Sequence, residues 1–199
     1  MTAAAAQGTV RMGSAPTIRI ADKQNYACVL CGRCCRRFCV RITAEEAARL
    51  EALEWGDEPD VPRDFVDTLG GRTYFRRRAS GGCVFLDEGT GGCRIHARFG
   101  FRPKALTCRG YPHNIVSTWP GEVSVVARLD CPAVQQNVGP PLTANRAMIQ
   151  ALVREMGIEG GFTPRQLAGL ERATIEAITA ALVGLVSGEI GRASCRERV

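Results

Sequence analysis

The chain has 199 residues, of which ten are cysteine and two are histidine, and its formal net charge is +6 at pH 7. This length is enough for one domain with a hydrophobic core, and no run of apolar residues reaches the roughly 18 that a membrane span needs. Because no apolar export segment precedes the first cysteine, we expect a cytoplasmic protein whose cysteines serve metal or redox chemistry rather than disulfides.

The first motif of the chain is a dense cysteine cluster. It follows residues 1–24, which are small and polar and are expected to be flexible. The cluster contains Cys28, Cys31, Cys34 and Cys35, and Cys39 lies just beyond it. The regular spacing of the first three lets their thiolates converge on one centre, as in iron–sulfur ligation. Side chains of adjacent residues point in different directions, so the vicinal pair predicts two centres or one multinuclear centre.

The region after the cluster predicts short helices and strands. Thr43, followed three residues later by Glu46, has the pattern of a capping box, so a helix is expected over about 44–55. Residues 56–71 are interpreted as a connector with a short helix near 63–69, and a strand is expected at 73–75.

Two of the four remaining cysteines flank a turn. Strands at 84–86 and 94–96 are expected on either side of the glycine-rich residues 87–92. The resulting hairpin would hold Cys83 and Cys93 close together.

The other two cysteines are expected at the ends of regular elements. A short helix that opens over 103–107 should present Cys108, and a strand over 123–129 should lead to Cys131.

The C-terminal part of the chain is predicted to be helical. Apolar residues at helical spacing indicate one helix over 144–156 and a second from the capping box at Thr163 to Gly188. We expect these two helices to pack as a hairpin, over residues 141–188.

The last eleven residues, 189–199, resemble a translated sequencing adapter. We therefore treat them as an artefact and exclude Cys195 from the candidate ligands.

Taken together, the remaining cysteines indicate a shared metal centre. Eight of them are the right number for two four-coordinate sites, and the ninth, Cys39, is either a spare ligand or a small buried apolar residue. His96 lies three residues after Cys93 and could replace a thiolate ligand or donate to one, but we expect structural or outer-sphere roles for both His96 and His113. The eight candidate ligands are Cys28, Cys31, Cys34, Cys35, Cys83, Cys93, Cys108 and Cys131.

Many of the basic residues gather near the cysteines. One interpretation is a nucleic-acid surface, and the other, which we favour, is that guanidinium groups offset the negative charge of metal-bound thiolates. On the second interpretation, Arg36, Arg37 and Arg109 should lie near the sulfur atoms.

These motifs resemble the CxxCxxCC, or YkgJ-type, cysteine-cluster family of zinc- or iron-chelating domains. The resemblance covers residues 28 to about 140. It is carried by Cys28-x2-Cys31-Gly-x-Cys34-Cys35-Arg36, Cys83-Val-Phe-Leu86, Cys93-Arg-Ile-His96, Cys108-Arg-Gly-Tyr-Pro112 and Cys131-Pro132. Flagellin lysine N-methylases carry a distantly similar cluster, so the resemblance also allows a protein-modifying role.

The sequence therefore predicts an α+β fold, in which a small, irregular, metal-centred domain over residues 25–140 precedes the helical hairpin. The function expected first is metal binding through iron or an iron–sulfur cluster, with a redox or cluster-dependent protein-modifying role. The alternative is a structural zinc module that binds nucleic acid or protein through an arginine-rich face. Both metals accept four thiolates in tetrahedral geometry, so the sequence leaves the metal, the partner and any enzymatic activity open.

Overall fold

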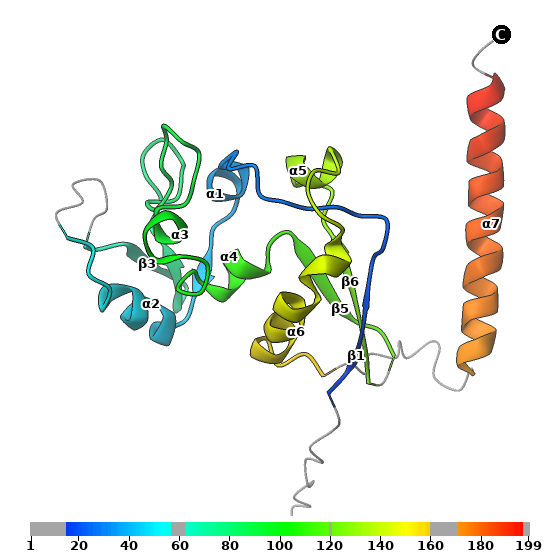
Figure 1. Cartoon of the computed structure of the whole chain (residues 1–199), viewed down its shortest axis with the longest axis horizontal. Helices are drawn as coiled ribbons and strands as arrows, with labels where there is room; N and C mark the ends of the chain where they lie inside the picture. The colour runs from blue at the N-terminus through cyan, green and yellow to red at the C-terminus, as the bar shows by residue number, and fades with distance from the viewer. Residues whose placement is uncertain (1–14, 57–62, 120, 160–170, 197–199) are drawn as a thin grey trace, which may run out of the picture. The chain divides into compact units, whose positions relative to one another are not determined.

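The computed structural model describes residues 15–56, 63–119, 121–159 and 171–196, and it has the mixed α+β character that the sequence predicts (Figure 1). The chain divides into two compact units, Met1–Gly161 and Phe162–Val199. The first unit holds two three-stranded sheets and several short helices, and the second holds the long helix α7 (Arg172–Arg196). Within the described ranges, no helix is long and apolar enough to cross a membrane.

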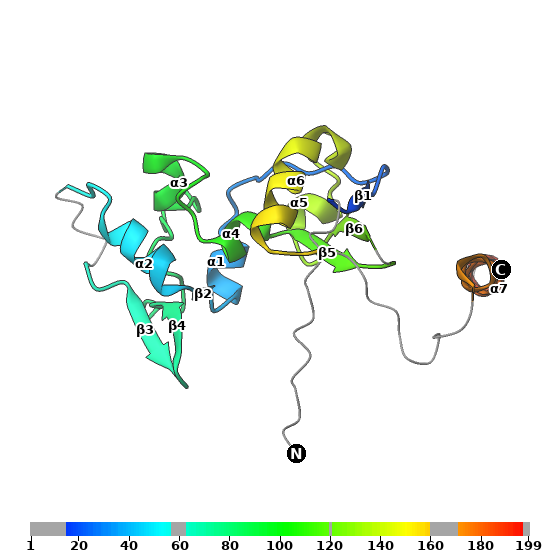
Figure 2. The ribbon, with the colours of Figure 1, turned by 90° about the horizontal axis from the view of Figure 1, so that it is seen from below.

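The first sheet is antiparallel and consists of β2 (Arg41–Ile42), β4 (Arg72–Phe75) and β3 (Val66–Leu69) in that order. A two-residue turn, Gly70–Gly71, joins β3 to β4 (Figure 2). Both glycines have positive φ angles, +57° and +71°, as this kind of hairpin turn requires. The short helix expected near 63–69 is therefore wrong, because the glycine pair favours a hairpin at this point.

Helix α2 (Ala44–Glu51) begins as predicted. Thr43 and Glu46 make both reciprocal hydrogen bonds of a capping box, so the start of the helix is confirmed. The helix ends at Glu51, earlier than expected, and the indole N–H of Trp55 donates to the carbonyl of Leu50 at 2.8 Å. This bond folds the following residues back onto the last turn.

The stretch after β4 is only partly the expected hairpin. Leu86 and Cys93 form an antiparallel bridge around the predicted turn, but residues 94–96 belong to helix α3 (Arg94–Phe99) and not to a strand. Residues four apart share one face of a helix. The helical backbone thus lets Ile95 enter the core while Phe99 contacts the ring of Trp55.

A hydrophobic cluster, the first core, gathers side chains from the first sheet, α2 and α3. Its fully buried residues all lie between Val40 and Ala105. Its centre is aromatic: the rings of Phe65, Phe75 and Phe85 contact one another with centroids 5.1 to 6.3 Å apart. Rings of this size dominate the energetics of a small core.

The second sheet has the order β1 (Thr17–Ile20), β6 (Glu122–Ala127), β5 (His113–Ser117). Strand β6 confirms the strand expected from residue 123, and β5 pairs with it in antiparallel fashion although no strand was predicted there. Strand β1 pairs with β6 in parallel and lies inside the segment 1–24 that was expected to be flexible. The reason is apolar burial, because the isoleucines of β1 pack against the buried residues of β6.

The second core covers this sheet with two helices, α5 (Pro132–Gln135) and α6 (Arg146–Glu155). The helix predicted over 144–156 is confirmed: the segment Leu142–Asn145 is a 3-10 turn, α6 follows, and Gly157 adopts a φ of +63° at its end.

Helix α7 differs from its prediction at the C-terminal end. It continues past Gly188, because one glycine within a helix costs only about 1 kcal/mol and does not by itself end it. The capping box at Thr163 lies outside the described residues. Ile178, Leu182 and Leu185, from the expected apolar stripe, are exposed. The packing of α6 and α7 as a hairpin stays a prediction.

Candidate metal centre

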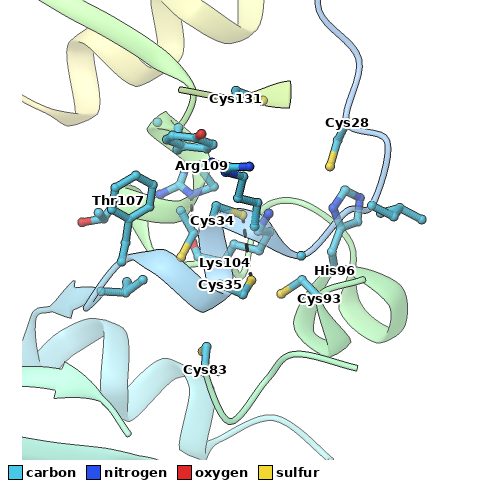
Figure 3. Close-up of a pocket in the computed structure, with 18 of the residues that line it drawn as sticks. Cys28, Cys34, Cys35, Cys83, Cys93, His96, Lys104, Thr107, Arg109 and Cys131 are labelled. Carbon is cyan, nitrogen blue, oxygen red and sulfur yellow. Dashed lines mark hydrogen bonds between the residues drawn. The ribbon is translucent and has the colours of Figure 1, made fainter. Parts of the chain in front are cut away.

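The nine cysteines from Cys28 to Cys131 all line one cavity of about 560 Å³ in the first unit. They come from segments far apart in the sequence, and Figure 3 shows six of them around the cavity. The fold therefore brings all eight candidate ligands, and Cys39 as well, to a common wall. These cysteines are Cys28, Cys31, Cys34, Cys35, Cys39, Cys83, Cys93, Cys108 and Cys131.

Two glycines allow the first cysteine segment to approach the Cys93 loop. Gly32 has a φ of +65° at the start of α1 (Arg33–Arg37), the helix that carries Cys34 and Cys35. Gly91 has a φ of +71°, and a Cβ atom there would lie 2.1 Å from the carbonyl oxygen of Leu30. Only glycine fits such a contact between two backbones.

The thiols of the vicinal pair form a hydrogen bond with each other. The Sγ atoms of Cys34 and Cys35 are 3.9 Å apart. The hydrogen bond from Cys35 lowers the pKa of Cys34 against the effect of burial, and the positive charge of Lys104 adds to the lowering. The same hydrogen bond, together with burial, raises the pKa of Cys35. One thiolate is thus available here near neutral pH.

The more deeply buried thiols are held in the protonated form. Burial raises the pKa of Cys83 to about 11 and also raises the pKa of Cys108. Because a metal binds the thiolate and not the thiol, binding at these positions must displace protons.

Cys108 is positioned by a short helix that makes hydrogen bonds to residues of two other helices. As expected, it lies on a short helix, α4 (Leu106–Gly110). The carboxylate of Glu46 in α2 accepts a hydrogen bond from the backbone N–H of Leu106 at 2.6 Å. On the other side, the buried guanidinium of Arg109 makes two hydrogen bonds to Glu155 in α6. The sequence analysis did not predict these hydrogen bonds, because each joins residues that are far apart in the chain.

The three arginines expected near the thiolates all bind carboxylates. Arg36 pairs with Glu88 at 2.5 Å, and Arg37 lies 3.9 Å from Asp130. Arg109 lines the cavity but pairs with Glu155, as described above. The cavity wall also includes three other cations, Arg33, Lys104 and Arg128.

The two histidines lie in different environments. His96, on α3, is exposed at the cavity, and burial followed by the charge of Lys104 lowers its pKa. His113, on β5, is buried, and its Nδ1 atom lies 3.0 Å from the carbonyl oxygen of Gly110. Burial lowers the pKa of His113, so its ring is neutral. The structural role expected for His113 stays a prediction.

Two tyrosines were not recognised from the sequence. Tyr26 and Tyr111 line the cavity, and in both burial is the main cause of a raised pKa, followed by nearby cysteines. The sequence signal that could have placed them at the cavity is their position, two residues before Cys28 and three after Cys108.

The sulfur atoms of the cysteines line a cavity and do not converge on a single point. As the side chains stand, the described residues contain no group of three cysteine, histidine or acidic side chains placed to hold one ion. Soft thiol donors on one wall are nevertheless the set that zinc, iron and iron–sulfur clusters bind. The donor chemistry therefore fits a thiolate-bound metal, and binding would require cysteine side chains to turn toward one another.

Comparison with known protein families gives one match. A family model named CxxCxxCC, and described as "Putative zinc- or iron-chelating domain", matches residues 27–134, which is more than half of the chain and includes all eight candidate ligands. A comparison with curated proteins finds no match, and a comparison with solved structures finds none either.

Proposed function

The chain belongs to the CxxCxxCC family of zinc- or iron-chelating domains, and from this premise we propose that its cysteines hold iron, as an iron centre or iron–sulfur cluster, for a redox or cluster-dependent role. The observation that carries the proposal is the common cavity wall formed by the eight candidate ligands. When bound, such a group supplies one-electron transfer.

The number and spread of the thiols favour iron over a single zinc ion. A structural zinc site uses four ligands, with Zn–S distances of about 2.3 Å. Here eight thiols, besides Cys39, surround about 560 Å³, which is more donors than one zinc ion binds. A donor set of this size and softness suits a multi-atom centre, or more than one centre.

The surroundings of the cavity also suit a redox centre. Apolar and aromatic side chains make up much of the rest of the wall, among them Phe38, Phe75, Phe85 and Met148. A hydrophobic shell limits the access of water and thereby tunes the reduction potential of a bound metal.

The zinc alternative rests on the arginine-rich surface, and the structure gives it less support. Arg36 and Arg37 line a smaller pocket next to Cys31, but each is already close to a carboxylate. Those carboxylates reduce the positive charge that a nucleic-acid phosphate would meet.

The test is metal analysis of the full chain purified without oxygen. We expect iron, acid-labile sulfide if a cluster is present, and a visible absorption spectrum that disappears on chelation. Cys39→Ser removes a thiol that is not one of the eight candidate ligands, so this control variant should keep the iron content of the wild-type chain. A colourless protein with stoichiometric zinc would overturn iron in favour of the structural module, and a chain that binds neither metal would overturn both.

A further inference from the structure

The eight candidate ligands are not spread evenly between the two cores. Cys83 is buried in the first core, and three further cysteines, Cys35, Cys93 and Cys108, pack against it. Cys131 is instead buried in the second core. The packing thus separates one group of four from at least one other cysteine.

Backbone contacts support the first group independently of packing. The backbone N–H of Cys83 donates to the carbonyl of Cys35 at 3.0 Å. Cys93 is held in the same place, because it pairs with Leu86, three residues after Cys83, in an antiparallel bridge. Cys108 completes the group, because it packs against the same core as Cys35 and Cys93.

A second group lies around Tyr26. This tyrosine lines the cavity two residues before Cys28, and it packs against the second core, in which Cys131 is buried. Tyr26 therefore links Cys28 to the core that holds Cys131, and Cys34 belongs to the same regularly spaced motif as Cys28 and lines the same cavity.

Cys31 joins the second group by two observations. It lies midway between Cys28 and Cys34, at the spacing that lets three thiolates converge. It also lines the smaller pocket together with Pro132, the neighbour of Cys131.

We propose that the eight cysteines form two separate four-thiolate metal sites, a first-core site and a Tyr26 site. This assignment rests on the proposed function, because it presumes that the cysteines bind metal. The first-core site consists of Cys35, Cys83, Cys93 and Cys108. The Tyr26 site consists of Cys28, Cys31, Cys34 and Cys131.

The vicinal pair is the point at which the two sites meet. Cys34 and Cys35 are adjacent on α1, and Figure 3 shows them between Cys83 on one side and Cys131 on the other. Their Sγ atoms are only 3.9 Å apart, so the two metal centres are close neighbours. Four thiolates saturate a tetrahedral ion or the four irons of a cubane cluster, so neither site needs Cys39 or a histidine.

The first test compares metal content among serine variants of the full chain. Cys93→Ser removes one ligand of the first-core site and Cys28→Ser one ligand of the Tyr26 site; neither residue is buried. Each variant should retain about half of the wild-type metal-to-protein ratio. The double variant in different sites, C28S/C93S, should lose nearly all of it. The double variant within one site, C28S/C31S, should lose no more than C28S alone.

The second measurement needs no variant. Wild-type protein is exposed to increasing chelator, and newly reactive thiols are alkylated and identified by mass spectrometry. We expect the thiols to become reactive in two groups of four with the memberships given above. Simultaneous release of all eight, or groups of mixed membership, would overturn the two-site assignment while leaving metal binding intact. A wild-type chain without metal would instead refute the proposed function on which the assignment rests.

Discussion

The two hydrophobic cores of the first unit are assembled in different ways. The first core takes its buried residues from one continuous stretch, Val40 to Ala105, and its centre is a group of phenylalanine rings. The second core is built on aliphatic residues, and it closes only when β1 pairs with β6, so that Thr17 lies opposite Glu122.

This difference in assembly predicts which part of the fold depends most on the cysteines. The chain must pass through the whole first core and the cysteine region before β6 can meet β1. Ordering such a long connection carries a chain-entropy cost, whereas the first core can form from nearer contacts. We therefore expect metal binding to stabilise the second core more than the first.

The largest expected loss of stability comes from replacing a large buried side chain in each core with alanine. Phe85→Ala should destabilise the metal-loaded protein by about 3–5 kcal/mol, and Ile149→Ala by about 2–5 kcal/mol, because both side chains are fully buried. Amide hydrogen exchange after chelation would sharpen the comparison. Phe85→Ala should then raise exchange mainly in 40–105, and Ile149→Ala mainly in the second sheet. Equal loss of protection in both regions would show that the cores do not differ as described.

A smaller effect is expected where the first cysteine segment meets the Cys93 loop. Gly91→Ala places a Cβ atom against the carbonyl of Leu30, so it should cost more than the roughly 1–2 kcal/mol of left-handed strain alone. It should also lower the metal content. Gly71→Ala is the matched control, because its φ is also +71° and nothing lies within 4 Å of the added atom. Urea unfolding and metal analysis give the comparison, and equal results for the two variants would contradict the close backbone contact.

The smallest effects are expected from the carboxylates that tie α4 to the two cores. Glu46→Gln, on the first-core side, should cost about 1–3 kcal/mol, because the carboxylate is buried and accepts two backbone hydrogen bonds. Glu155→Gln, on the second-core side, should cost no more than about 1 kcal/mol, because that side chain is 42% exposed and the pair is screened by solvent. A larger loss for Glu155→Gln would reverse the proposed order.

The stabilisation from the Arg109–Glu155 ion pair should decrease in acid. The hydrogen bond from Arg109 lowers the pKa of Glu155 below its ordinary value of 4.5. Its contribution to stability is therefore complete above pH 4.5 and is lost as the pH falls through the lowered pKa. Wild type and Glu155→Gln should differ in unfolding free energy at pH 7 and converge in acid, and a difference that persisted in acid would contradict this origin.

Sequence reasoning succeeded where the signal is local. The capping box of Thr43 and Glu46, the strand at β6 and the helix that stops before Gly157 all follow from residues a few positions apart. The hairpin at Gly70–Gly71 had an equally local signal, which was read as part of a connector. Such patterns are informative because hydrogen bonds within a helix or turn have a fixed spacing along the chain.

The amino-acid sequence alone indicates thiol chemistry: it has many cysteines, few histidines and a vicinal pair that predicts more than one set of ligands. Only the folded structure brings the nine cysteines from Cys28 to Cys131 to the wall of one cavity. It also places β1 beside β6, Glu46 beside Leu106, and Tyr26 on the cavity wall. The physical reason is that these neighbours are joined by burial and by contacts across long stretches of chain, and no local spacing specifies them.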